Sequence, residues 1–452
     1  MTALELAERA VGHAEPGALA QVVRERSLLL RFAAGRPTQA TAVDDVTVEL
    51  AVIRRGHVGR AETNATDDES LVSCARRAAA AAASAAAAGD GVYPGFPARS
   101  EAPSFDGGHD AATAALDPGQ GGAALGAAFE VAAEAGLEAH GIWTAAEVEH
   151  AVMAGGAALT ERTTDAYMKV ICIGRDGGRS GYAARTAVGA AELDPRGLAA
   201  CAAAKALRSG EPAELAPGEY PVVFESHGVG TLLDLLGFSA FNGLAHAEGR
   251  GALSGQLGAK VAAPAVNLSD SPRFARTLPR AFDAEGTPKA PLPLIQDGVA
   301  HRVVHDVRSA ALAGAASTGH ALAPGGAPYG PHPTNLVLAG GGAANEDELC
   351  ASVERGIYVT RLWYGNVVRP KETLVTAVTR DGTFLIEDGQ VTRPLHDLRL
   401  TDSVLAILSA VEALTASLQL TSEGEFYGRR FATGVACPAL RAAAVRFTGP
   451  AG

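Results

Sequence analysis

Two short stretches of the chain hold residues that could bind a metal ion. The first places Glu225 and His227 where a predicted strand, 222–224, meets a predicted helix, 228–243. A zinc peptidase of the HExxH type needs two histidines on one helical face with a glutamate beside the first, and the order here differs. We therefore expect Glu225 and His227 to make capping or interface contacts instead of binding a metal.

The second stretch is "DGVAHRVVHDV", in which His301 and His305 stand four residues apart. On a helix this spacing would place both imidazoles on one face. The preceding glycine turn and the valines indicate a strand instead, where residues four apart lie roughly 13 Å from each other. That separation is too large for one ion, so we do not expect a zinc pair here.

Acidic and small polar residues gather in two further stretches, "AFDAEGTPKAPLPLIQDGV" and "AASTGHALAPGGAPYGPHPTN". With flexible glycine-rich backbone between them, such groups can present side chains and N–H groups to a peptide or a carboxylate. Six residues are the candidates for a substrate cleft: Asp283, Glu285, Ser317, Thr318, His320 and Asn335. The alternative interpretation is that Asp283 and Asn335 fix turns through their side chains.

These six candidates lie in the second of two predicted domains. A chain of 452 residues is too long for one core, so two domains are expected. Proline and glycine in "SGEPAELAPGEYP" mark the boundary. We predict an N-terminal domain of helices and antiparallel sheet over 1–212 and a β-rich domain over 218–452.

Periodicity predicts the elements that position these residues. In the first domain we expect helices over 2–26, 119–138 and 194–208, and one that begins after an N-cap at Thr66. Strands with turns at 35–37, 44–45 and 55–56 precede strands near 140–147, 150–158, 165–174 and 180–188. Later helices are expected over 346–355 and 402–418, and "GTFLIEDGQVTRPL" predicts a hairpin. Alanine helices bury little area, so we expect the core to depend on Leu, Val, Ile and Phe.

Composition excludes several classes of protein. The net charge of −12 and the absence of dense Lys/Arg runs argue against a nucleic-acid surface. The N-terminus lacks an apolar signal core, and no stretch of about 18 residues is apolar enough to span a membrane. The five cysteines are scattered and never form CxxC, which disfavours a disulfide framework and a four-cysteine zinc site. We expect a soluble cytoplasmic protein.

Five stretches of the second domain, taken in order, resemble the TldD/PmbA family, also called modulators of DNA gyrase. They are "FDAEG", "LIQDGV", "STGH", "PTNLVLAGG" and "GTFLIEDGQVTRPL". In the first domain "VELAVIRRGHVGRAETNATDDESL" and "DGGRSGYAART" match less sharply, and together the stretches cover nearly the whole chain. The fold that the resemblance implies is α+β, with a helix-plus-antiparallel-sheet domain followed by a β-rich, barrel-like domain.

The resemblance also implies where a zinc site would lie. In this family a TldD-like subunit carries a His-Glu-x-x-x-His helix after the first strand of its second domain, and a cysteine ligand just before the hairpin. The slot for that helix here is 231–239, with Asp234 and Ser239 at the ligand positions and Leu235 at the glutamate position. No cysteine occurs from residue 351 to residue 436.

The resemblance therefore implies a TldE-like subunit with no catalytic residue and no metal ligand of its own. Zinc is expected on a TldD-like partner, and the pair would hydrolyse small or unfolded peptides, including precursors of natural products. Two alternatives stay open: a homodimeric peptide-binding or regulatory module, and an autonomous metallopeptidase with ligands among His227, His246, His301 and His305. No nucleic-acid or membrane partner is expected.

Overall fold

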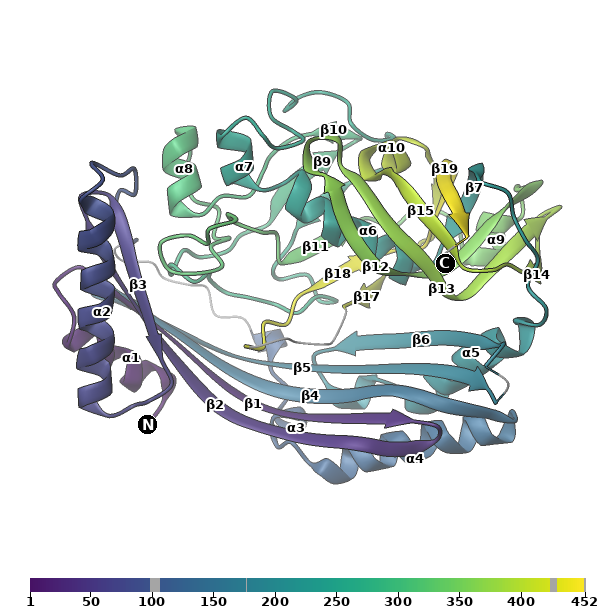
Figure 1. The fold of residues 1–452 in the computed structure, drawn as a ribbon, viewed down its shortest axis with the longest axis horizontal. Helices are drawn as coiled ribbons and strands as arrows, with labels where there is room; N and C mark the ends of the chain where they lie inside the picture. The colour runs from purple at the N-terminus through teal and green to yellow at the C-terminus, as the bar shows by residue number, and fades with distance from the viewer. Residues whose placement is uncertain (98–105, 176, 423–428, 451–452) are drawn as a thin grey trace.

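The computed structural model describes residues 1–97, 106–175, 177–422 and 429–450. Its N-terminal half contains one long, curved antiparallel sheet, and its C-terminal half lies over one face of that sheet (Figure 1). The strand order in the N-terminal sheet is β3-β2-β1-β4-β5-β6. These strands are β1 (Leu19–Ala33), β2 (Arg36–Arg54), β3 (His57–Thr63), β4 (Leu137–Ala154), β5 (Ala157–Gly174) and β6 (Ser180–Ala187).

Helices cover the other face of the N-terminal sheet (Figure 1). α1 (Ala3–Gly12) and α2 (Asp68–Ala86) pack at one end of the long strands, and α4 (Pro118–Glu134) and α5 (Pro195–Arg208) pack at the opposite end. Because side chains alternate along a strand, Val22 points to these helices whereas its neighbour Val23 faces the C-terminal half. The short helix α3 (Ala111–Ala114) precedes α4.

Two glycines allow the alanine-rich helices to approach the sheet closely. A Cβ on Gly181 of β6 would lie 2.2 Å from the Ala202 carbonyl oxygen of α5. A Cβ on Gly59 of β3 would lie 2.0 Å from the Ala82 nitrogen of α2. The small alanines on the facing side of α5 are therefore part of the core themselves, in addition to the larger apolar residues that we expected.

Five strands of the C-terminal half close into a barrel. β7 pairs with β12 and β19, β12 with β13, β13 with β15, and β15 with β19, so the ring returns to its start. The bounds are β7 (Gly218–Phe224), β12 (Arg355–Arg369), β13 (Leu374–Glu387), β15 (Leu398–Ser403) and β19 (Leu440–Pro450). β14 (Gln390–Pro394) and β16 (Val411–Leu414) pair at its margin.

A second sheet of the C-terminal half lies beside this barrel, in the order β10-β9-β8-β11-β18-β17. Its strands are β8 (Leu268–Asp270), β9 (Leu292–Gln296), β10 (Val299–Ala300), β11 (Asn335–Leu338), β17 (Gln419–Thr421) and β18 (Gly434–Cys437). α6 (Ser226–Ser239) follows β7 directly, and its leucines share one core with the barrel and this sheet. The remaining helices are α7 (Gly243–Ala247), α8 (Val307–Ala313), α9 (Glu346–Cys350) and α10 (Val404–Ser409).

The α+β class and the β-rich, barrel-like second domain are confirmed. The hairpin is confirmed too, with Asp388 and Gly389 at its turn. The domain boundary between 212 and 218 stays a prediction. Within the described ranges, every helix is too short or too polar to span a lipid bilayer.

Several predicted elements are wrong. The helix over 2–26 ends at Gly12, and residues from Leu19 onward form β1. The neighbours Val22 and Val23 face opposite sides of the sheet and both sides are covered, so the apolar residues of this segment do not alternate with polar ones. The turn at 44–45 and the breaks within β4 and β5 are also wrong, since these strands run through. The N-cap of α2 is Asp67, one residue after Thr66. Residues 402–418 form β15, α10 and β16 instead of one helix.

Candidate functional site

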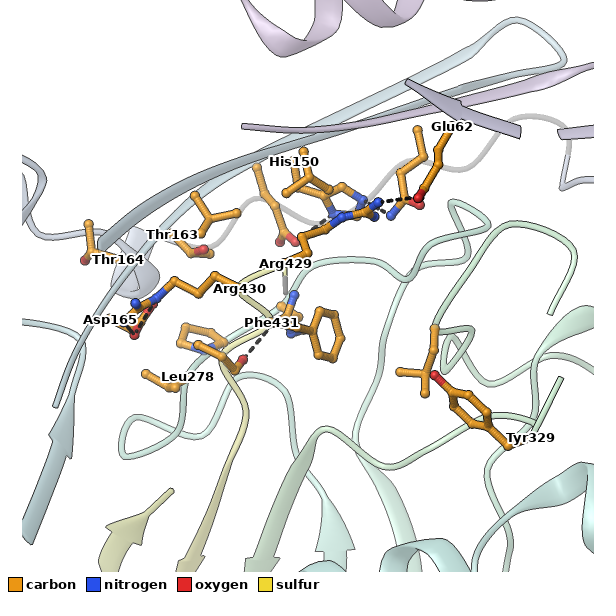
Figure 2. A pocket seen from close by; sticks show the side chains of 18 residues that line it. Glu62, His150, Thr163, Thr164, Asp165, Leu278, Tyr329, Arg429, Arg430 and Phe431 are labelled. Carbon is orange, nitrogen blue, oxygen red and sulfur yellow. Dashed lines mark hydrogen bonds and ion pairs between the residues drawn. The ribbon is translucent and has the colours of Figure 1, made fainter. Parts of the chain in front are cut away.

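Two neighbouring cavities lie between the N-terminal sheet and the C-terminal half, and Phe431 lines both. One, which we call the interdomain cavity, has a volume of about 440 Å³ and is drawn in Figure 2. The other, which we call the α6 cavity, has a volume of about 660 Å³ and lies along α6. Both are large enough for a ligand, since ligand pockets typically measure about 300–1,000 Å³.

Alternating residues of the N-terminal sheet form one wall of the interdomain cavity. Val23 of β1 lies opposite His150 of β4, which in turn lies opposite Glu161 of β5. The His150 ring stacks on Phe282 with 4.8 Å between centroids, and its two nitrogens lie near the side chains of Gln21 and Glu161. The other Glu161 oxygen accepts the Ala281 N–H at 2.7 Å. This wall therefore holds the C-terminal half in place through both packing and hydrogen bonds.

Loops of the C-terminal half form the opposite wall, from residues 278–280, Leu322, Tyr329 and 429–432. Figure 2 shows Arg430 reaching Asp165 of the sheet, and Arg429 reaching Glu62. The Arg430–Asp165 pair is buried and bidentate, and Arg430 Nη1 also donates to Thr144 Oγ1 at 3.1 Å. Such a pair joins segments that are 265 residues apart in the chain. It fixes the position of Phe431 between the two cavities.

The α6 cavity occupies the place where the family resemblance puts a zinc helix. Thr231, Asp234 and Leu235 of α6 line one side, and Arg361, Trp363 and Tyr364 of β12 lie among the residues on the other. Arg361 pairs with Asp381 and stacks over the Tyr182 ring at 4.5 Å. The helix that we expected over this slot is therefore present and faces a cavity.

The side chains at the three slot positions do not fit a zinc ion. Asp234 is half exposed, and its Oδ1 lies 3.6 Å from His332 Nε2. Leu235 has no donor atom, and the Ser239 hydroxyl donates to the Leu235 carbonyl oxygen at 3.0 Å. A catalytic zinc takes three protein ligands and leaves a position for water. Nowhere in the described residues do three His, Cys, Asp or Glu side chains gather in a way that could hold a metal ion.

Cys437 is the cysteine that contacts α6, and its chemistry is that of a structural thiol. Its Sγ lies 3.3 Å from the Ser226 carbonyl oxygen, and burial raises the pKa of this thiol to about 12. Within the described residues Cys437 belongs to no group of three possible metal ligands. Cys437 therefore does not replace the cysteine that the family resemblance would place before the hairpin.

Glu225 and His227 make interface contacts, as expected. Glu225 is the N-cap residue of α6, and its carboxylate pairs with Lys205 of α5 at 2.7 Å and accepts the Tyr358 hydroxyl at 2.8 Å. His227 Nε2 lies 3.1 Å from the Ala184 carbonyl oxygen of β6. Burial lowers the pKa of His227 to about 4, so the imidazole is neutral at neutral pH.

The stretch around His301 and His305 is not a strand beyond Ala300, which corrects our prediction for this segment. His301 is exposed, whereas His305 is buried with its Nδ1 3.2 Å from the Ser309 hydroxyl. His305 contacts Ser309 because the chain turns here into α8, whose N-cap is Asp306. The two histidines therefore lie in different environments.

The structure separates the six cleft candidates into two polar groups, and the first contains Asp283 and Glu285. Asp283 accepts backbone N–H groups from Glu285, Thr287 and Ala321 at 2.9–3.0 Å, which is the turn-fixing role of the alternative interpretation. Burial raises the pKa of Asp283 to about 6. Glu285 accepts the Tyr93 hydroxyl at 2.9 Å and the Val307 N–H at 2.8 Å, and burial, then Asp283, raise its pKa.

The other candidates lie around Asp270, a buried residue that the sequence did not reveal. His320 Nε2 lies 3.2 Å from Asp270 Oδ1, and Thr318 Oγ1 lies 2.9 Å from His320 Nδ1. The Asn335 N–H donates to Asp270 Oδ2, and Asn335 Nδ2 donates to the Leu278 carbonyl oxygen at 2.6 Å. Ser317 Oγ donates to the His305 carbonyl oxygen at 3.3 Å. Burial would raise the pKa of Asp270, but Lys289 and His320 outweigh it and lower that pKa.

The described residues that line the interdomain cavity include none of the six candidates. Asn335 nevertheless supports this cavity, because it holds the carbonyl of Leu278 in its wall. Sequence reasoning missed the lining residues because they come from separate strands and loops. One signal was present: Arg280 immediately precedes the stretch "AFDAEG" that we had singled out.

Known proteins resemble this chain in sequence and in fold. Residues 217–449 match the PmbA/TldA metallopeptidase C-terminal domain, and residues 20–82 match domain 1 of the same metallopeptidases. Curated relatives include a metalloprotease of Methanothermobacter thermautotrophicus, 27% identical over 38% of this chain and 37% of that protein. A metalloprotease TldD homolog of Haemophilus influenzae is 26% identical over 45% of this chain and 42% of its own length. The chain thus matches less than half the length of these relatives.

Solved structures extend the similarity of fold over the whole chain. The crystal structure of TldE from Thermococcus kodakarensis superposes with a TM-score of 0.85, at 18% identity, over 98% of this chain and 99% of that one. A protein named as a modulator of a DNA gyrase, from Thermotoga maritima, gives a TM-score of 0.82 at 19% identity over 98% of both chains. The family match covers more than half of the chain. The chain belongs to the PmbA/TldD family of metallopeptidases.

Proposed function

We propose that this chain is the non-catalytic, TldE-like subunit of a two-chain zinc peptidase that acts on small or unfolded peptides. A TldD-like partner supplies the zinc ion and the glutamate that activates water. This chain contributes a surface for the partner and part of the path of the substrate. Natural-product precursors are one class of peptide that such a pair would process.

One observation carries the proposal: α6 is formed and faces a cavity, but its three key positions hold Asp234, Leu235 and Ser239. Leucine cannot serve as a general base, and the Ser239 hydroxyl is engaged by the backbone of its own helix. A peptide-hydrolysing zinc site needs protein ligands and a base together. The helix that would carry the zinc site is thus present, but the residues that would bind zinc and activate water are replaced.

The names of the similar proteins are consistent with a pair of subunits, because they include a TldE and TldD homologs. The charged interface between the two halves of this chain gives a rigid scaffold on which a partner could dock. The edge strands of the C-terminal half offer backbone groups that could pair with an extended peptide.

The test is a peptidase assay on this chain, on a candidate HExxxH partner, and on their mixture. We expect activity from the mixture and none from this chain alone. The decisive control is a partner whose HExxxH glutamate is replaced by glutamine, mixed with intact copies of this chain. Full turnover in that control would place the catalytic residues in this chain and overturn the proposal. A stable self-dimer that binds peptides without a partner would favour the homodimeric alternative.

A further inference from the structure

Arg280 is a cation in the wall of the interdomain cavity that forms no ion pair with any described carboxylate. Its neighbours in this wall differ, since Arg429 pairs with Glu62 and Arg430 with Asp165. The Glu161 oxygens, which are near enough to influence Arg280, are occupied by the Ala281 N–H and by His150. Within the described chain, the charge of Arg280 is therefore the unpaired one among the three arginines of the cavity.

The contacts that Arg280 does make satisfy its guanidinium only in part. Nη2 donates to the Ala432 carbonyl oxygen at 2.7 Å, and the group stacks over the Phe431 ring at 3.9 Å. Nε is buried and has no hydrogen-bond partner in the described structure. Burial lowers the pKa of Arg280, while Glu161 and Asp165 oppose that shift. A desolvated, incompletely paired cation of this kind favours an anionic ligand.

The rest of the cavity suits a ligand that is largely apolar. Apolar side chains from both halves of the chain line it: Val23, Val148, Leu278, Pro279, Leu322 and Phe431. The hydroxyl of Thr163 also faces the cavity and has no hydrogen bond within the described residues, so it can contact a ligand (Figure 2). One arginine beside an apolar wall matches one negative charge beside an apolar side chain.

We propose that Arg280 binds a carboxylate of a peptide in the interdomain cavity, an inference that rests on the proposed function for the choice of a peptide. The planar guanidinium matches a carboxylate in shape and charge. Glu161 and Asp165 lie in the same wall, so a ligand with two or more negative charges, such as phosphate, would be repelled. The carboxylate is either the C-terminal one or that of an acidic side chain.

The first test uses the unmodified chain and three unlabelled, N-acetylated pentapeptides in isothermal titration calorimetry. The peptides are Ala-Ala-Ala-Leu-Leu as a free acid, the same peptide as a C-terminal amide, and the amide of Ala-Ala-Ala-Leu-Glu. We expect the free acid to bind at least about tenfold more tightly than the Leu-Leu amide, because a hydrogen bond to a charged group is lost in the amide. Tight binding of the Glu-ending amide as well would assign the acidic side chain as a second source of the carboxylate.

The second test uses matched variants. Arg280→Gln should bring the affinities for the acid and the amide of Ala-Ala-Ala-Leu-Leu to within about twofold, and Arg280→Lys should keep part of the difference. Arg196→Gln removes the same charge from outside both cavities, from a pair with the exposed Glu130, and should keep the full difference. Thermal unfolding of each variant identifies those that are folded.

Equal affinity of the unmodified chain for the acid and both amides would overturn the proposal, and this comparison requires no variant. A folded Arg280→Gln variant that retains the tenfold preference would overturn it as well. Both measurements use this chain alone. They are thus separate from the test of the proposed function, which measures peptide hydrolysis by mixtures of this chain with its partner.

Discussion

The two faces of the N-terminal sheet are covered in different ways. On the helix side, alanines of α2 and α5 approach glycines of the strands, and the contact is apolar and close. On the side of the C-terminal half, the sheet meets loops through ion pairs, a stacked histidine and two cavities. The same six strands therefore pack closely against helices on one face. On the other face they meet the C-terminal half through polar contacts that leave two cavities.

This difference indicates where function can reside. A close-packed alanine layer leaves no room for a ligand, and any added atom must displace backbone. The polar face instead holds charged groups that are costly to bury and that need precise partners. Most of those groups are paired, and Arg280 is the exception among the arginines of the interdomain cavity. The polar face is thus the place to look for a ligand.

The largest effect that we expect comes from the buried ion pair of the polar face. Arg430→Met leaves the Asp165 carboxylate buried without its bidentate partner. Breaking a buried pair by removing one member typically costs about 3–5 kcal/mol, so the free energy of unfolding should fall by about that amount. Urea unfolding followed by circular dichroism measures it.

The matched control is Arg429→Met, one residue earlier in the chain. Its partner Glu62 has 68% of its side chain exposed, and exposed pairs contribute only about 0–1 kcal/mol. A similar loss of stability in both variants would mean that the burial of the Arg430 pair is not what holds the two halves together. It would also mean that the buried pair Arg430–Asp165 and the exposed pair Arg429–Glu62 contribute equally to stability.

A smaller effect is expected on the apolar face. Gly181→Ala puts a Cβ 2.2 Å from the Ala202 carbonyl oxygen, so α5 must move away from β6. Forcing extra volume into a close-packed contact costs about 1–3 kcal/mol, and we expect thermal unfolding to show a loss of that size. The affinity for the peptides above should stay unchanged, because the helix side does not line either cavity.

The control for this variant is Gly126→Ala in α4, where no heavy atom lies within 4 Å of the added Cβ. Alanine is the better helix former, so stability should rise by roughly 0.5–1 kcal/mol. An unchanged or increased stability for Gly181→Ala would show that the helix layer is less tightly packed than its glycine contacts indicate.

The sequence predicted the parts of the fold that depend on local patterns. The helix of residues 226–239 after the first strand of the second domain, the turn at Asp388 and Gly389, and α5 all follow from periodicity and turn residues. Residues 19–26, the first part of β1, were misread as helix. Val22 and Val23 lie on opposite, covered faces of this strand, which removes the alternation that identifies a strand. The register of a strand and the elements that cover its two faces depend on distant segments of the chain, about which a local sequence pattern holds no information.

The candidate site was less predictable for the same reason. Asp283 and Asn335 were found as polar residues near glycines. Asn335 joins a network centred on Asp270, which no pattern distinguishes, whereas Asp283 holds the backbone N–H groups of a separate turn. The interdomain cavity is formed by contacts such as Gln21 with His150, 129 residues apart. Whether an arginine is paired or not, as with Arg280 and Arg430, depends entirely on such distant contacts.

The last effect that we predict concerns pH and the contact of His227 with the sheet. His227 is neutral in the folded chain because burial lowers its pKa to about 4, whereas an unfolded chain has the ordinary histidine value of 6.5. As the pH falls from about 6.5 towards 4, the unfolded state binds a proton that the folded state does not, so stability falls through this window. Between pH 7 and pH 5 the loss should be on the order of 1–2 kcal/mol.

The groups around His227 determine how this loss must be measured. Glu225 favours the protonated form of His227, whereas Lys205 and Arg361 oppose it. Burial has the largest influence on the pKa of His227 and lowers it. Asp283 acts in the opposite direction, because its pKa is raised to about 6 and its contribution grows as the pH falls through a partly overlapping window. The total pH dependence of the chain is therefore a sum of opposing effects, and the share of His227 is obtained by comparison with His227→Gln.

Urea unfolding at pH 7 and pH 5 should show a smaller loss of stability in the variant than in the unmodified chain. An identical loss in both would mean that His227 takes up a proton without breaking its contact with β6, and that this part of the polar face is as insensitive to pH as the apolar one.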